Sequence, residues 1–216
     1  GKILPTKKFI EGIESNTHRM PQSIFIQTIS GQYANDVEGG LPEDVYNPTD
    51  TDIIIKPDFK TIRLVPWYDD PTAEVICDAI EMNGNPVQNA PRNILKKILD
   101  LYKNINFKPI VSPEVEFYLV KKNSDPDYPL EVPVGQSGRQ ETGKQSFGID
   151  AINEFDPLFE DLYNFCEQQK IEIDTINHES GSAQMEINFQ HGNPLELADQ
   201  VFLFKRTLRQ AAIKHK

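Results

Sequence analysis

The stretch Ser112-Pro113-Glu114-Val115-Glu116-Phe117-Tyr118-Leu119 alternates polar and apolar side chains, a pattern typical of a half-buried β-strand. Successive side chains of a strand point to opposite faces of its sheet. Glu114 and Glu116 are therefore predicted on one face, and Val115 and Phe117 on the other. Such a strand combines an apolar row facing the core with a row of carboxylates.

The stretch His178-Glu179-Ser180-Gly181-Ser182-Ala183-Gln184-Met185-Glu186-Ile187-Asn188-Phe189 repeats this pattern in its second half. Gln184, Glu186 and Asn188 share one predicted face, and apolar residues occupy the other. The small residues 180–183 precede this strand and allow backbone or a ligand to approach closely. A second strand with a row of oxygen-bearing side chains is expected here.

Rows of carboxylate and amide oxygens suit Mg²⁺ or Mn²⁺ better than zinc. A single Glu-x-Glu sequence on a strand is usually only the solvated face of that strand. Here the pattern occurs twice, and Glu179 and Glu186 stand on both sides of the small-residue segment. The sequence therefore leaves a metal or phosphate site and a solvated face as equal alternatives.

The 216 residues include 22 basic and 33 acidic side chains, which give a net charge of −11. The acidic balance argues against nucleic acid or an anionic membrane surface as a partner. We expect neither a signal peptide nor a membrane segment, because no apolar run reaches the roughly 20 residues of a membrane span. Cys77 and Cys166 lack metal-ligand spacing, so buried, reduced thiols in a cytoplasmic protein are expected.

The sequence of the first half of the chain predicts a small mixed sheet followed by a helix. Residues 1–51 are rich in turn formers, and the Asn-Gly-Asn sequence at 83–85 fits a hairpin tip. A helix with one apolar stripe is expected at 91–102. Short strands are expected at residues 23–29, 52–55, 61–65 and 73–79.

The second half alternates strands with longer helices. Strands are expected at 108–120, 171–176 and 182–190, and helices at 153–169 and 194–216. The intervening loop 123–149 is longer than a compact domain normally tolerates without a function. Its residues Arg139, Glu141 and Lys144 either contact a nucleotide or substrate or belong to a flexible, solvated loop.

Several segments of the chain resemble the glutamine synthetase superfamily, and most of all its γ-glutamylpolyamine (γ-glutamylputrescine) synthetase branch. They occur in the order in which the family carries them and extend over nearly the whole chain. The matching segments are Lys56-Pro57-Asp58-Phe59-Lys60-Thr61, Pro66-Trp67, Val75-Ile76-Cys77-Asp78, Pro91-Arg92, 112–117, 178–187, Ala198-Asp199-Gln200 and Phe204-Lys205.

The resemblance implies an α+β protein with two domains. Residues 1–105 would form a β-grasp N-terminal domain that is incomplete at its start. Residues 106–216 would form the first part of a catalytic domain, a curved antiparallel sheet with flanking helices. The chain would then be an N-terminal and early catalytic-domain fragment, and we expect such a fragment to be inactive as a ligase by itself.

The resemblance also assigns metal ligation to four glutamates. Glu114 would bind the metal that bridges the ATP phosphates, and Glu116, Glu179 and Glu186 would bind a second metal near the glutamate substrate. The implied cofactor is Mg²⁺ or Mn²⁺, with ATP as co-substrate. A divalent cation is needed because phosphoryl transfer to a carboxylate brings two anions together.

No catalytic side chain is identified from the sequence. His178 is a candidate for contact with the substrate or with a metal ligand, although a structural histidine is the stronger interpretation. Gln184 shares the predicted face of Glu186 and either orients a ligand or bonds to a neighbouring loop.

The implied reaction joins the γ-carboxylate of glutamate to ammonia or a primary amine through a γ-glutamyl phosphate. Ammonia-using relatives carry an Asp in a loop of the small domain, and the comparable stretch 19–25 has no acid. This difference favours γ-glutamylpolyamine synthesis over glutamine synthetase proper. A non-catalytic, glutamine synthetase-like binding protein is a further alternative, against which the clustered carboxylates argue. For the full-length protein the resemblance implies a homo-oligomeric ring.

Overall fold

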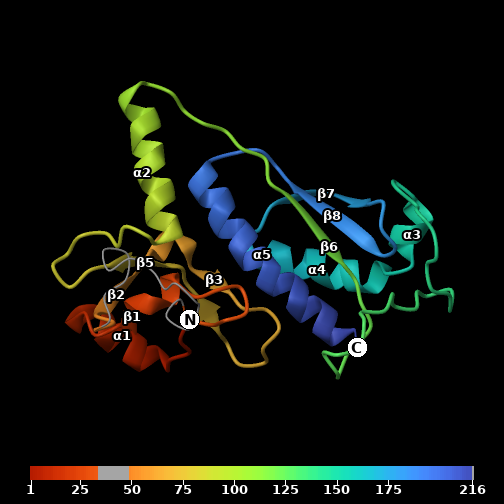
Figure 1. Cartoon of the computed structure of the whole chain (residues 1–216), viewed down its shortest axis with the longest axis horizontal. Helices are drawn as coiled ribbons and strands as arrows, with labels where there is room; N and C mark the ends of the chain where they lie inside the picture. Colours follow the sequence, from red (N-terminus) through yellow and green to blue (C-terminus); the bar gives the residue numbers. More distant parts are fainter. Residues whose placement is uncertain (34–48, 216) are drawn as a thin grey trace. The chain divides into compact units, whose positions relative to one another are not determined.

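The computed structural model describes residues 1–33 and 49–215, and the chain divides into two compact units (Figure 1). The first unit contains Gly1–Ile62 and Val75–Lys108. The second unit contains Arg63–Glu74 and Pro109–Lys216. Among the described residues, no helix combines the length and the apolar character needed to cross a bilayer.

The first unit is built on an antiparallel sheet with the strand order β1-β2-β5. Its small apolar core contains Ile53, Ala79, Val87 and Ala90. The elements of this unit are α1 (Thr6–Ser15), β1 (Arg19–Pro21), the 3₁₀ helix η1 (Gln22–Phe25), β2 (Asp52–Pro57), the 3₁₀ helix η3 (Phe59–Thr61), β5 (Cys77–Ile80) and α2 (Pro91–Asn104).

Helix α1 occupies a region for which the sequence predicted only turns and one strand. His18 folds back over this helix, where its ring stacks on Phe9 at 5.4 Å and its Nε2 lies 2.8 Å from the Phe9 carbonyl. A Cβ atom at Gly12 would lie 2.2 Å from the His18 ring. The glycine therefore lets the ring lie directly on the helix.

The strand expected at 23–29 is wrong at its start, because Gln22–Phe25 form the 3₁₀ helix η1. Ser23 is buried, and both its backbone N–H and its hydroxyl donate to the carboxylate of Asp50, at 2.9 and 2.7 Å. This contact with a distant carboxylate satisfies the Ser23 donors without a neighbouring strand.

The second unit contains a three-stranded antiparallel sheet with the order β6-β8-β7, from β6 (Glu114–Tyr118), β7 (Ile173–His178) and β8 (Gln184–Phe189). Every second residue of β8 is buried, at Met185, Ile187 and Phe189. The predicted alternation is therefore present. The strand expected at 108–120 is shorter, however, and covers only the residues of β6.

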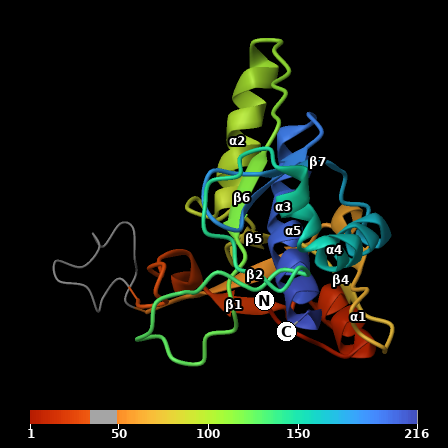
Figure 2. The same cartoon turned by 90° about the vertical axis from the view of Figure 1, so that its right-hand side faces the viewer.

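Helices α4 (Asp156–Gln169) and α5 (Pro194–Lys214) lie side by side against this sheet (Figures 1 and 2). Phe189 of β8 meets Phe204 of α5 edge to face, with ring centres 5.2 Å apart. A short helix, α3 (Ile149–Asn153), precedes α4. The single helix expected at 153–169 thus begins later than predicted, with a proline in the first turn of α4.

A small hairpin of β3 (Arg63–Leu64) and β4 (Ala73–Glu74) also belongs to the second unit. Trp67 in this hairpin packs edge to face on Phe165 of α4, with ring centres 5.9 Å apart. The Arg206 guanidinium of α5 lies over the Trp67 ring at 5.1 Å and pairs with Glu74. These contacts attach the hairpin to the helices.

Candidate functional site

The two predicted rows of polar side chains lie on neighbouring strands of one sheet. In the antiparallel pairing of β6 with β8, Glu116 is directly opposite Glu186, and Glu114 is opposite Asn188. Side chains opposite each other on neighbouring antiparallel strands share a face of the sheet. Three of the four predicted metal ligands therefore project from the same face, away from the core that α4 and α5 cover.

Gln184 orients Glu116 on this face. Its side-chain oxygen accepts hydrogen bonds from the Tyr118 hydroxyl at 3.0 Å and from the Gly181 N–H at 2.8 Å. Two donors at the oxygen leave the amide NH₂ free for Glu116, to whose Oε2 it donates at 2.7 Å. Gln184 thus bonds both to the neighbouring turn, through the Gly181 N–H, and to the carboxylate of Glu116.

Asn188 supports Glu186 in the same way. Its amide donates to Glu186 Oε1 at 3.0 Å and to the Thr175 hydroxyl at 3.2 Å. Its oxygen, Oδ1, is buried and has no hydrogen-bond partner. An unsatisfied oxygen beside two carboxylates is a donor set that fits a hard divalent cation such as Mg²⁺ or Mn²⁺.

Glu179, the fourth predicted ligand, lies just after β7 in the turn 179–183. Its backbone N–H donates to the Gln184 carbonyl at 2.8 Å, which ties the turn to the start of β8. Within residues 1–33 and 49–215, no three His, Cys, Asp or Glu side chains come close enough together to hold one metal ion. Glu114, Glu116 and Glu186 share a face of the sheet without forming a closed coordination shell.

His178 lies on the opposite, buried side of the sheet, next to Met185 in the register of β7 and β8. Its side chain has an exposed fraction of 0%. Nδ1 lies 2.7 Å from the Glu179 carbonyl oxygen, and Nε2 lies 2.9 Å from Glu141 Oε2. His178 therefore reaches the carboxylate face only through the backbone of Glu179.

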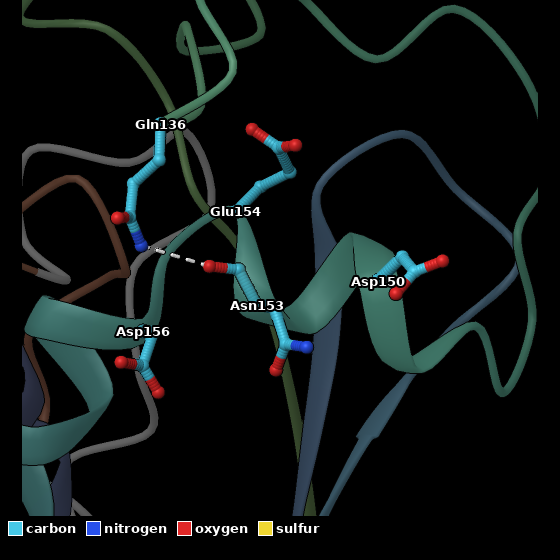
Figure 3. Close-up of a pocket in the computed structure, with 5 residues that line it drawn as sticks. All are labelled: Gln136, Asp150, Asn153, Glu154 and Asp156. Atoms are coloured by element: carbon cyan, nitrogen blue, oxygen red, sulfur yellow. Dashed lines mark hydrogen bonds between the residues drawn. The ribbon is translucent and has the colours of Figure 1, made fainter.

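An open pocket lies elsewhere in the second unit and contains none of the predicted site residues (Figure 3). The side-chain NH₂ of Gln136 donates to the Asn153 carbonyl at 2.9 Å across it. Its lining residues are Gln136, Asp150, Asn153, Glu154 and Asp156. This lining is acidic and hydrophilic, and it does not include Glu114, Glu116, Glu179 or Glu186.

Tyr118 was not predicted as a contributor to this face of the sheet. Tyr118 is separated from Glu116 by one residue of β6, so the alternation of the strand predicts it on the same face as Glu114 and Glu116. Glu141 lies in the long loop between β6 and α3, for which the sequence predicted either contact with a nucleotide or substrate or a solvated loop. Only 7% of its side chain is exposed, so the solvated-loop interpretation is wrong for this residue.

Residues 88–216 match the family described as glutamine synthetase, catalytic domain. The glutamine synthetase of Methanocaldococcus jannaschii is 32% identical over 77% of this chain and 36% of that protein. The glutamate–isopropylamine ligase of a Pseudomonas species is 29% identical over 76% of this chain and 35% of that protein. The γ-glutamylputrescine synthetase PuuA of Escherichia coli K12 is 27% identical over 100% of this chain and 45% of that protein.

The chain thus spans less than half the length of these relatives. A solved structure described as a novel glutamine synthase homolog has a TM-score of 0.76 and 18% sequence identity, over 100% of this chain and 46% of that chain. At this identity the likeness establishes the fold alone, a set of helices and antiparallel sheets.

Proposed function

Because the chain belongs to the glutamine synthetase family, we propose that the protein is an ATP-dependent ligase that joins the γ-carboxylate of glutamate to an amine. The family resemblance predicted from the sequence is confirmed by the match over residues 88–216. The proposed reaction proceeds through a γ-glutamyl phosphate, whose acyl group an amine attacks. This chain spans 36% of the length of the Methanocaldococcus jannaschii relative and 45% of that of PuuA, so the proposal concerns the whole protein.

The opposed pair Glu116 and Glu186 carries this proposal. We propose Glu114, Glu116, Glu179 and Glu186 as ligands of Mg²⁺ or Mn²⁺. A cation bound there neutralises charge that develops on the transferred phosphoryl group. Gln184 and Asn188 would fix the carboxylate orientations, since each donates to one of the two opposed glutamates.

The proposed acceptor is a primary amine of the polyamine class. The γ-glutamylputrescine synthetase aligns with the entire chain, which supports this choice. The stretch 19–25, which contains β1 and η1, has no acidic residue to take a proton from ammonium. Ammonia is the second candidate, and the higher identity to an archaeal glutamine synthetase, 32%, favours it. For either acceptor, we propose a ring-shaped homo-oligomer.

The experiment is a ligase assay with the full-length protein, ATP, glutamate and Mg²⁺. Putrescine, isopropylamine and ammonia are supplied separately, and phosphate release and the glutamyl product are measured. We expect the highest kcat/KM with putrescine and loss of activity in Glu186→Gln. Glu172→Gln removes an equal charge from an exposed position next to β7 and serves as the matched control.

Three results would contradict parts of this proposal. A higher kcat/KM with ammonia would replace the polyamine with ammonia as acceptor. Full activity of Glu186→Gln would remove the metal role of the opposed glutamates. Absence of phosphate release with every amine would contradict the ligase function itself.

A further inference from the structure

The turn 179–183, which joins β7 to β8, is held from outside by one carboxylate of a distant loop. Glu141 Oε2 lies 2.9 Å from His178 Nε2, on the residue before the turn. The same oxygen accepts the N–H of Ala183, the last residue of the turn, at 2.8 Å. Glu141 therefore fixes both ends of the turn at a single atom.

The conformation of the turn explains why such a support is needed. Ala183 has φ of +54°, in the left-handed region that residues with a Cβ rarely adopt. Its side chain is fully buried. Without Glu141, the Ala183 N–H would be a buried donor with no partner in this arrangement. The strained residue and its hydrogen bond thus depend on the same carboxylate.

Hydrogen bonds hold His178 at both of its ring nitrogens and at its backbone carbonyl. The Glu179 carbonyl can only accept, so Nδ1 of His178 carries a proton and donates it. The backbone of His178 also contacts the loop, because the His178 carbonyl accepts a hydrogen bond from the Phe147 N–H at 2.9 Å. Loop and turn are therefore connected at three points.

We propose that Glu141 is a positioning residue that fixes the turn 179–183 and thereby aims Glu179 and Gln184 at the candidate metal site. The inference rests on the proposed function, in which Glu179 is a ligand. Glu141 does not itself lie on the carboxylate face. It acts through His178, whose imidazole bonds to the Glu179 carbonyl, and through Ala183, which precedes Gln184. Gln184 in turn donates to Glu116.

A positioning role and a merely structural role predict different metal affinities. Loss of a residue that orients metal ligands typically weakens metal binding by about 10- to 100-fold. A structural glutamate would lower the unfolding temperature and leave the affinity for the metal unchanged. The dissociation constant for Mn²⁺ is therefore the measurement that separates the two roles, independently of ligase activity.

The experiment titrates the full-length protein with Mn²⁺ and follows the free ion by electron paramagnetic resonance. We expect Glu141→Ala to raise the Kd by about 10- to 100-fold. Glu141→Gln keeps an oxygen for the Ala183 N–H, so we expect a smaller increase of about threefold or more. Glu131→Ala is the matched control, because Glu131 lies in the same loop and its exposed carboxylate pairs with Lys121.

Each result decides the proposal. A Kd for Glu141→Ala equal to that of the parent, with a lower unfolding temperature, overturns the positioning role. If Glu141→Ala does not fold, Glu141→Gln decides, and a parental Kd for that variant overturns it. A parental Kd for Glu186→Gln overturns the metal site itself and the positioning role with it. Weaker binding in Glu186→Gln combined with parental binding in Glu141→Ala overturns only the positioning role.

Discussion

Asp58 and Arg92 lie 34 residues apart in the chain and are joined by a hydrogen bond of 2.7 Å between Oδ2 and Nη2. Arg92 also pairs with Asp78, which in turn pairs with Lys96. Only 14% of the Arg92 side chain and 23% of the Asp58 side chain are exposed. The network ties the end of β2 and the middle of β5 to the first turns of α2, and it joins three of the segments that carry the family resemblance.

This network makes the stability of the protein sensitive to acid. The hydrogen bond from Arg92 lowers the pKa of Asp58 below its ordinary value of 3.8. A carboxyl whose folded pKa is lowered stabilises the fold above its unfolded pKa, and this stabilisation is lost as the pH falls through the folded pKa. We expect Asp58→Asn to lower the free energy of unfolding by about 1 to 3 kcal/mol at pH 7. The difference should shrink below pH 4.

Urea unfolding at pH 7 and at several values below pH 4 measures this effect. Asp69→Asn is the control, because Asp69 is exposed in the β3–β4 hairpin. An Asp58→Asn effect that stays constant down to the lowest pH would show that the lost carboxylate charge is not its source.

Tyr118→Phe tests the chain of hydrogen bonds that leads to Glu116. The substitution removes only the donor to Gln184 Oε1 and leaves the Gly181 N–H as the remaining donor. A lost hydrogen bond of this kind is worth about 0.5 to 1.5 kcal/mol. We expect the concentration of Mg²⁺ for half-maximal ligase activity to rise by about two- to tenfold, with little change in unfolding temperature.

Tyr128→Phe is the comparison variant, because Tyr128 is exposed and lies in the loop between β6 and α3, outside the sheet. An identical Mg²⁺ requirement in Tyr118→Phe and the parent would mean that Gln184 holds Glu116 without help from the tyrosine.

Gly12→Ala tests the packing of His18 on α1. Alanine is normally the better helix residue by about 1 kcal/mol. Here its Cβ would lie 2.2 Å from the His18 ring, so the ring must leave its place. Loss of the stacking on Phe9 and of the hydrogen bond to its carbonyl should make the substitution destabilising by about 1 to 3 kcal/mol.

The double variant Gly12→Ala/His18→Ala supplies the control for this prediction. Without the ring there is nothing to displace, so Gly12→Ala should stabilise the His18→Ala background. The sign of the effect thus reverses between the two backgrounds. The same sign in both would show that the glycine serves another purpose.

Cys166 should be unreactive in the folded protein. It is buried in α4, and burial raises the pKa of its thiol to about 12. The thiolate is the reactive form, so iodoacetamide at pH 8 should label half-buried Cys77 faster than Cys166. Mass spectrometry of both sites checks this, with protein in urea as the control. Equal labelling rates before unfolding would contradict the burial of Cys166.

The faces of β6 and β8 were predictable because strand alternation is a local property. The sequence alone predicts that Glu114, Glu116 and Glu186 lie on the polar sides of their strands, and in the structure the three residues share one face of the sheet. The register that sets Glu116 opposite Glu186 was not available from either strand. It depends on which strands pair and in which direction.

Elements fixed by distant contacts escaped prediction. Helix α1 has no side-chain cap at its start, no acid in its first turn and a glycine in its interior, so its local signal is weak. His18, whose ring stacks on Phe9 of this helix, lies beyond the end of the helix. Glu141 sits among turn-forming residues that suggest exposure, and only its contacts with His178 and Ala183 explain its burial.

The strict alternation of β8 has a consequence for the natural variation of this protein. Deleting one residue between Ala183 and Phe189 would change the face on which part of the strand places its side chains, so polar side chains would enter the core and apolar ones would meet water. Substitutions that keep the alternation leave both faces in place. Among homologous sequences, we therefore expect amino-acid substitutions in this segment but no change in its length. Insertions should accumulate instead in the loop between β6 and α3.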